Sequence, residues 1–174
     1  MKTIESFIVG NSNKFAHAAA FAVAEKQSPL YSPLLIFGDP GTGKTHLLHA
    51  IGHYSSKKFP HHKIVYVKRD EFTKELIDAI KKGKCVGFRE KYKVADLLLM
   101  DDVQSVAGKT ETQNELLNIF CALHELGKQI VIASGRPPSE MATLEGGLIA
   151  RFESSLMAEI LPPDGDLRRA IISS

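Results

Sequence analysis

A glycine-rich run is the stretch of this sequence best suited to chemistry. It reads Gly38-Asp39-Pro40-Gly41-Thr42-Gly43-Lys44-Thr45 and lies between the apolar residues 34–37 and a helical pattern. Glycines let backbone N–H groups turn inward around phosphate oxygens, and the N-terminus of a following helix adds partial positive charge. Lys44 can reach the β- and γ-phosphates, and the Thr45 hydroxyl can bind Mg²⁺. A turn that merely precedes a helix is the alternative, but the eight-position match favours a nucleoside triphosphate site.

Two carboxylates end another apolar run. Residues 97–100 are Leu-Leu-Leu-Met, and Asp101 and Asp102 follow them. In a triphosphatase site, Asp101 would hold Mg²⁺ through its water shell, because this ion keeps several of its waters. Asp102 would orient or deprotonate the attacking water. Such a pair can also be a plain surface feature, but the upstream phosphate loop favours the catalytic interpretation.

Arg151 is a further candidate, far downstream in the run 148–152. An arginine at such a position is usually a surface charge. In oligomeric ATPases it can instead enter the site of the next subunit and stabilise the transferred phosphate. Spacing alone leaves both interpretations open.

Apolar runs and helical patterns alternate around these residues. Short β-rich runs predict five strands, at 34–37, 64–67, 95–100, 129–134 and 155–160. Helical spacing predicts helices at about 11–25, 44–58, 70–82, 85–92 and 110–126, a short one from 139 and a last one from about 164. Asn11 or Ser12 is expected to cap the first helix and Thr110 the fifth. This alternation implies a mostly parallel sheet covered on both faces.

Composition restricts the class of protein further. The 174 residues are 44% hydrophobic, which suits one globular domain. The net charge is +2, but residues 57–93 carry 12 Lys/Arg against 5 Asp/Glu. A basic region of this kind suits nucleic acid, and a solvated helical surface explains it equally well.

Cysteines and histidines give weaker signals. Cys85 and Cys121 lack metal-ligand spacing, no apolar stretch is long enough to span a membrane, and no secretory signal opens the chain. A cytoplasmic protein with reduced thiols is therefore expected. His46, His49 and His53 fall near one helical face, where helix packing is favoured over a metal site because no carboxylate or cysteine accompanies them.

Seven short stretches form one more pattern. They are residues 7–13, 15–19, 43–52, 101–104, 107–109, 112–113 and 136–140. Together they resemble the AAA+ ATPase domain of the bacterial replication initiator family DnaA, and the resemblance runs through nearly all of the chain. The stretch 43–52 is especially specific, because generic AAA+ proteins lack its histidines.

The resemblance implies a three-layer P-loop NTPase fold of the AAA+ type, with a parallel five-strand sheet in the order 5-1-4-3-2. It implies one nucleotide-binding domain over residues 1–174, with an initiator-specific helical insertion at about 70–92. No lid domain and no helix-turn-helix domain is expected within the sequence. The implied activity is weak ATP hydrolysis acting as a switch, with ATP or ADP and Mg²⁺ as cofactors.

Site residues follow from the resemblance and the motifs together. Nucleotide contacts are expected at Val9 and Gly10 near the adenine, and at Gly38, Pro40, Gly41, Thr42, Gly43, Lys44, Thr45 and His46. Metal ligation is expected from Thr45 and Asp101. Catalysis is expected from Asp101, Asp102 and Arg151, and of these Arg151 falls on the family's arginine finger. Ile77 and Lys109 fall on positions that contact single-stranded DNA. Implied partners are single-stranded and origin DNA, further copies in an ATP-bridged oligomer, and the replicative helicase or initiator regulators.

Two departures from the family pattern keep a second function open. Gly135 stands where the family carries an aspartate that senses the γ-phosphate, and Glu111 replaces a common basic residue in a DNA-contacting loop. These favour a regulatory relative that stimulates the ATPase of an initiator through Arg151. A helicase loader with a similar core is a third interpretation. The leading one is an ATP-binding, slowly hydrolysing domain of an initiator that assembles on and opens origin DNA.

Overall fold

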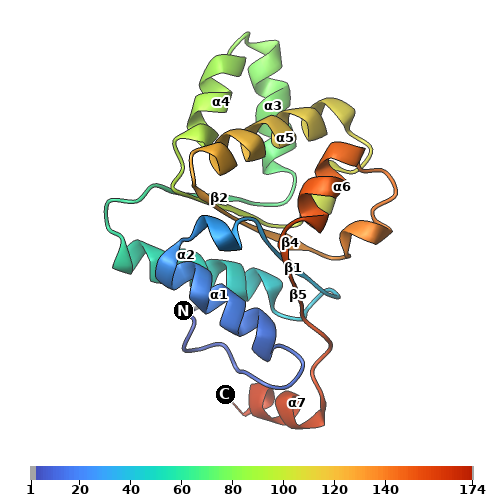
Figure 1. The fold of residues 1–174 in the computed structure, drawn as a ribbon. Helices are drawn as coiled ribbons and strands as arrows, with labels where there is room; N and C mark the ends of the chain where they lie inside the picture. The colour runs from blue at the N-terminus through green and yellow to red at the C-terminus, as the bar shows by residue number, and fades with distance from the viewer. Residues whose placement is uncertain (1–2, 174) are drawn as a thin grey trace.

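The computed structural model describes residues 3–173, apart from the side chain of Pro29, and places a single sheet between two layers of helices (Figure 1). The strands are β1 (Leu34–Phe37), β2 (Ile64–Val67), β3 (Leu97–Met100), β4 (Gln129–Ser134) and β5 (Leu156–Glu159). All pairs are parallel, in the order β2-β3-β4-β1-β5. Read from the other edge this is 5-1-4-3-2, so the expected fold and strand order are confirmed.

The helices divide between the two faces of the sheet. They are α1 (Lys14–Lys26), α2 (Lys44–Lys58), α3 (Glu71–Lys81), α4 (Cys85–Lys93), α5 (Thr110–Glu125), α6 (Gly146–Glu153) and α7 (Gly165–Ile172), with short 3₁₀ turns η1 (Pro29–Tyr31), η2 (Val103–Val106) and η3 (Pro138–Glu140). In Figure 1, α1 and α2 cover one face, α3 to α6 lie on the other, and α7 lies beyond α1. Among the described residues, no helix combines the length and the apolar character that crossing a bilayer would require.

Side-chain alternation along the strands separates two apolar cores. Leu34 and Ile36 pack with α1 and α2, whereas Leu35 faces the α5 side, and all three are fully buried. Along β3, Leu97 and Leu98 divide in the same way. Burial on both faces explains why these strands are continuous apolar runs. Because the strands are parallel, the loops after β1 and β3 lie at the same edge of the sheet.

The predicted helix caps are wrong at two helices. In α1 the cap position is occupied by Asn13 and not by Asn11 or Ser12, and in α5 it is Lys109, with Thr110 as the first helical residue. Asn13 does not cap with its side chain, because its Oδ1 accepts the Gly10 N–H at 2.8 Å and its Nδ2 donates to the Ile8 carbonyl at 3.0 Å. At α7, by contrast, Asp164 caps with its side chain, and its Oδ1 accepts the Leu167 N–H at 2.8 Å.

Helix α6 was not predicted. Its first two residues are glycines, which indicate a turn, yet Leu148 and Phe152 are four residues apart and fully buried. A Cβ at Gly147 would lie 2.7 Å from Leu117 Cδ2, so a glycine here lets α6 approach α5 closely. The helix is therefore specified by packing against α5 more than by its own sequence.

Candidate nucleotide-binding site

The glycine-rich run forms a tight loop between β1 and α2. Gly43 has φ 102° and occupies the N-cap position of α2, a backbone conformation that other residues rarely adopt. At Gly38, an added Cβ would lie 2.3 Å from the Ile160 carbonyl oxygen. The sequence therefore needs glycine at both positions, and the loop backbone stays bare, as close approach to a phosphate requires.

Helix α2 begins directly at the end of the phosphate loop. The N–H groups of Lys44, Thr45 and His46 precede the first helical hydrogen bond, from the Leu47 N–H to the Gly43 carbonyl at 2.9 Å. The first N–H groups of an α-helix lack partners within the helix and favour anions. Three donors at this end of α2 therefore fit the phosphate chain of a nucleotide.

Lys44 lies folded over the loop. Its side chain is nearly buried, and its Nζ donates to the Gly38 and Asp39 carbonyls, both at 2.7 Å. Burial lowers the pKa of the ammonium, and Asp102, Asp101 and Asp39 act in the opposite direction. The ammonium therefore lies at the loop itself, where the motif predicts phosphate binding.

The two residues expected to bind Mg²⁺ are in contact. Thr45 Oγ1 donates to Asp101 Oδ2 at 2.8 Å, and the Tyr66 hydroxyl approaches the same oxygen at 3.3 Å. Burial, followed by the charge of Asp101, raises the pKa of Tyr66, which keeps this hydroxyl a donor. A hydroxyl and a carboxylate together suit Mg²⁺, which prefers oxygen ligands and retains several waters.

Histidines do not add to this oxygen set. Within residues 3–173, no three His, Cys, Asp or Glu side chains are grouped as a metal site would require. The His49 ring stacks on Tyr66 with centroids 4.4 Å apart, and the His46 ring meets Phe7 edge-on at 5.3 Å. The expectation that these histidines serve packing is consistent with both contacts.

Asp102 points into a separate network. Its Oδ2 accepts from Arg69 Nε at 2.9 Å, and its Oδ1 accepts from Gln104 Nε2 at 3.1 Å. Gln104 Oε1 in turn accepts the Gly135 N–H at 3.1 Å. Sequence reasoning missed Arg69 and Gln104, although Gln104 belongs to one of the stretches that carry the family resemblance.

The N-terminal segment lies against the phosphate loop. A Cβ at Gly43 would be 3.0 Å from the Phe7 ring, and His46 Nε2 lies 3.3 Å from the Thr3 carbonyl oxygen. The His46 side chain thus contacts the N-terminal segment. Val9 and Gly10 line a cavity of about 430 Å³ together with the start of α7.

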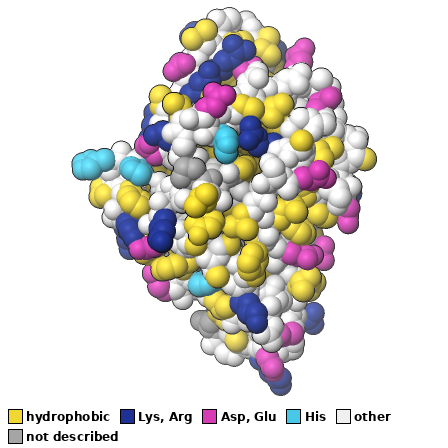
Figure 2. All heavy atoms as spheres, in the orientation of Figure 1, with side chains coloured by type: hydrophobic (Ala, Val, Ile, Leu, Met, Phe, Trp, Pro, Cys, Tyr) yellow, Lys and Arg dark blue, Asp and Glu magenta, His cyan; other side chains and the backbone are white. Residues whose placement is uncertain are grey.

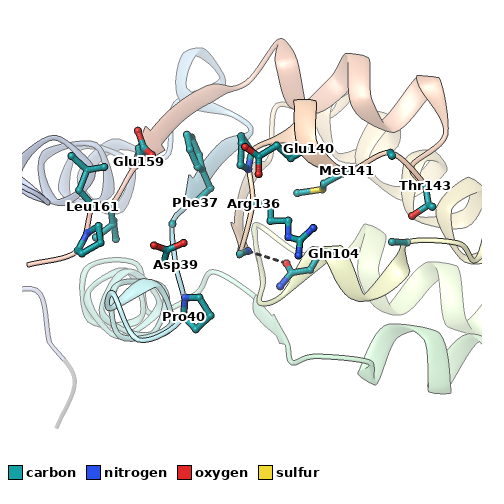
Figure 3. A pocket seen from close by; sticks show the side chains of 17 residues that line it. Phe37, Asp39, Pro40, Gln104, Arg136, Glu140, Met141, Thr143, Glu159 and Leu161 are labelled. Carbon is teal, nitrogen blue, oxygen red and sulfur yellow. Dashed lines mark hydrogen bonds between the residues drawn. The ribbon is translucent and has the colours of Figure 1, made fainter.

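A larger cavity of about 930 Å³ opens at the start of the loop (Figure 3). Gly38, Asp39 and Pro40 form one wall, and residues 135–137, 140–143 and 159–162 form others. Leu161 also donates its N–H to the Ser12 carbonyl at 3.0 Å, so this segment runs between the two cavities. Of the expected nucleotide contacts, Gly38 and Pro40 line the larger cavity and Val9 and Gly10 line the smaller one, whereas Gly41 to His46 line neither.

Arg151 lies outside both cavities of its own chain. It belongs to α6, and its Nη2 donates to Cys121 Sγ on α5 at 3.2 Å. The side-chain hydrogen bond of Arg151 is therefore directed to α5 and not to the phosphate loop. The geometry is thus compatible with the arginine-finger role that the resemblance implies.

The residues expected to contact DNA belong to the α3 side of the molecule. Ile77 is 47% exposed on α3, and Lys109 Nζ lies 3.7 Å from Asp70 at the start of that helix. Figure 2 shows Lys and Arg side chains gathered over the end of the molecule formed by α3 and α4. Three rings, Phe72, Phe88 and Tyr92, hold these helices together, with centroids 5.1–5.2 Å apart.

Comparison with solved structures identifies near relatives. Domain III of the Thermotoga maritima replication initiation protein DnaA is 44% identical, with a TM-score of 0.96 over 99% of this chain and 72% of that one. A replication initiator DnaA bound to AMPPCP and single-stranded DNA is 41% identical, with a TM-score of 0.93 over 99% and 53%. AMPPCP-bound DnaA from Aquifex aeolicus is 41% identical, with a TM-score of 0.91 over 98% and 53%.

The chain thus spans about half the length of the two nucleotide-bound relatives. The DnaC helicase loader shares the fold alone, at 17% identity and a TM-score of 0.74. The family model for the bacterial DnaA ATPase domain matches residues 1–159. With its phosphate loop, strand-end carboxylates and sheet order in place, this chain belongs to the bacterial DnaA ATPase-domain family.

Proposed function

We propose that this chain is the ATP-binding, slowly hydrolysing domain of a DnaA-type initiator that assembles on origin DNA and opens it. The observation that carries the proposal is the contact between Thr45 and Asp101, which joins the phosphate loop to the end of β3. Family membership and the nucleotide-bound relatives support it. DNA as the partner also implies a cytoplasmic protein.

In this proposal each residue of the site has a defined task. The amides at the start of α2 and Lys44 bind the phosphates, while Thr45 and Asp101 would hold Mg²⁺, which would supply positive charge to neutralise the phosphates. Asp102 accepts the proton of the water that attacks the γ-phosphorus, and ADP is the leaving group. Arg151 of a neighbouring copy stabilises the charge on the transferred group, so that ATP bridges two subunits.

DNA would lie along the basic surface of α3 and α4. Ile77 offers an apolar contact for a base, and Lys109 and the exposed lysines of α3 and α4 contact phosphates. Because phosphate contacts release counterions, binding should weaken steeply with salt. Retention of a labelled single-stranded oligonucleotide on filters should be stronger with ATP than with ADP, and equal retention would argue against an ATP-dependent switch.

Two lysines of one helix provide the test of nucleotide binding. Lys44 lies at the start of α2, whereas Lys57 is exposed near its end. At about 100 times Kd, Mg·ATP should raise the melting temperature of the unmodified chain and of Lys57→Ala by roughly 5–10 °C. Lys44→Ala should show no such shift. Equal shifts in both variants, or none in the unmodified chain, would exclude this site.

A regulatory role is the second candidate. Gln104 Nε2 would lie 3.1 Å from a Cβ at Gly135, so Gln104 fills the space beside the position where the family carries its sensing aspartate. A chain altered there could act mainly by supplying Arg151 to an initiator. Phosphate release by a full-length initiator, with and without this chain, separates the two functions, because a regulator raises that rate without binding DNA.

A further inference from the structure

The turn before α3 is tied to the catalytic edge of the sheet. Arg69 follows β2, and its Nε donates to Asp102 Oδ2, just after the neighbouring strand β3, at 2.9 Å. The Arg69 side chain is 69% exposed, and that of Asp102 is 26% exposed. The pair is therefore open to competition from solvent and ligands on the arginine side.

Asp102 is held on both of its oxygens. Besides Arg69, the Gln104 amide donates to it, and Gln104 also accepts the Gly135 N–H, the bond drawn as a dashed line in Figure 3. The network thus crosses the ends of three adjacent strands, β2, β3 and β4. Asp101 Oδ2 lies outside this network, because it accepts hydrogen bonds from the hydroxyls of Thr45 and Tyr66.

Arg69 also belongs to the basic surface. The Glu71 N–H donates to the Arg69 carbonyl at 2.7 Å, so the turn that carries Arg69 is also the start of α3. Lys68 and Lys74 are exposed nearby, and neither has a recorded ion pair among the described residues. A polyanion on this surface therefore meets the guanidinium of Arg69 directly.

Competition for Arg69 favours a phosphate. Partly exposed ion pairs of the Arg69–Asp102 kind contribute little to stability. A guanidinium binds phosphate through two parallel, charge-assisted hydrogen bonds. Occupation of the surface by nucleic acid can thus take the arginine away from the carboxylate at small cost.

We propose that Arg69 is a positioning residue that holds Asp102 while the α3 surface is empty and releases it when a phosphate of single-stranded nucleic acid binds there. This inference rests on the proposed function and adds its regulation. The occupied surface frees one oxygen of the carboxylate that would accept a proton from water. DNA binding and hydrolysis in one subunit are thereby linked through a single side chain.

If DNA and Asp102 compete for Arg69, changing Asp102 should alter DNA binding even when no nucleotide is present. Asp102→Asn removes the carboxylate charge that competes with a DNA phosphate for Arg69. It should therefore tighten binding of a labelled oligothymidylate about two- to fivefold at low salt. In the Arg69→Ala background the same substitution should have no effect. Asp78→Asn, which removes another exposed carboxylate from α3, is the control, and its effect should be equal in both backgrounds. Unchanged melting temperatures establish that the variants are folded.

Hydrolysis gives the second readout. The oligonucleotide should accelerate ATP hydrolysis by the unmodified chain and by Arg69→Lys, which keeps the charge. Arg69→Ala should hydrolyse ATP faster without DNA and should no longer respond to it.

The outcomes separate this inference from the function on which it rests. If Asp102→Asn tightens DNA binding equally with and without Arg69, the proposed release of Asp102 by Arg69 is wrong, but the proposed DNA contact on the α3 surface is unaffected. Slower DNA-free hydrolysis by Arg69→Ala also overturns it. Absence of any oligonucleotide binding at low salt overturns both the inference and the proposed DNA contact.

Discussion

At the scale of single residues, the loop conformation depends on what glycine leaves out. Gly38 and Gly41 both have positive φ, 157° and 81°. Only at Gly38 would a Cβ collide with backbone, whereas none of the described atoms lies within 4 Å of a Cβ at Gly41. The two positions therefore separate the cost of a clash from the cost of backbone conformation.

Gly38→Ala should destabilise the nucleotide-free chain by about 1–3 kcal/mol more than Gly41→Ala, because a methyl group must displace the Ile160 carbonyl. Urea unfolding followed by circular dichroism measures the difference. Equal losses of unfolding free energy in the two variants would mean that the backbone after β5 moves to accommodate the methyl group at little cost.

Which contacts the sequence could predict depends on whether both partners belong to recognisable motifs. Thr45 and Asp101 could be paired in advance because each ends a recognisable motif that a parallel sheet brings to one edge. Arg69 and Asp102 lie 33 residues apart, and no motif marks the arginine. Its role depends on the exact register of β2 on β3, which composition and periodicity do not determine.

At the scale of helices and strands, the apolar runs predicted the strands of the sheet but not where the helices begin. All five strands lie where β-rich runs predicted them. For β1, β3 and β4, burial on both faces leaves few other interpretations of the run. The caps of α1 and α5 and the whole of α6 depend on tertiary partners. Asn13 is used by the Ile8 and Gly10 backbone, and α6 is stabilised by α5.

A two-pronged ion pair joins α4 to α5. Arg89 Nε and Nη2 donate to the two oxygens of Glu115 at 2.5 and 2.9 Å, and the Glu115 side chain is only 12% exposed. The hydrogen bond from Arg89 holds the pKa of Glu115 below its usual 4.5, against the effect of burial. The stabilisation is therefore complete above about pH 4.5 and is lost as the pH falls through the lower folded-state pKa.

Glu115→Gln should lower the free energy of unfolding by about 0.5–1 kcal/mol at pH 7, with a smaller difference from the unmodified chain at pH 3. Denaturant unfolding at the two pH values measures this. Asp78→Asn, at an exposed pair with Lys82, should change little at either pH. A loss of the same size at both pH values would assign the effect to packing and not to charge.

At the scale of the whole molecule, the sheet separates two surfaces with different tasks. The phosphate loop and α2 belong to one core, and α3 to α6 belong to the other. Alternating strands and helices predicted a covered parallel sheet, whereas the strand order came from the family resemblance. Arg151 lies on the α6 side, away from the cavities of its own chain, so a complete site is expected to need a second copy.

Mixing two inactive variants tests this arrangement. Lys44→Ala lacks nucleotide binding but supplies Arg151, and Arg151→Ala has the reverse defect. A random head-to-tail assembly pairs an intact site with an intact arginine at one junction in four, so an equimolar mixture should recover up to about a quarter of the unmodified rate. Phosphate release measures it, with Arg168→Ala as an active control. No recovery on mixing would place both groups in the same subunit.

Asn13 has a consequence for which base the site accepts. Its buried amide fixes the main chain at Ile8 and Gly10, beside the hollow assigned to adenine, while the Val9 side chain is 46% exposed. The backbone groups of Ile8 and Gly10, and not the side chain of Val9, would then distinguish adenine from guanine. We expect Asn13→Ala to narrow the preference for ATP over GTP and Val9→Ala to preserve it, as competition against labelled ATP measures. An undiminished preference in Asn13→Ala would mean that guanine is rejected elsewhere.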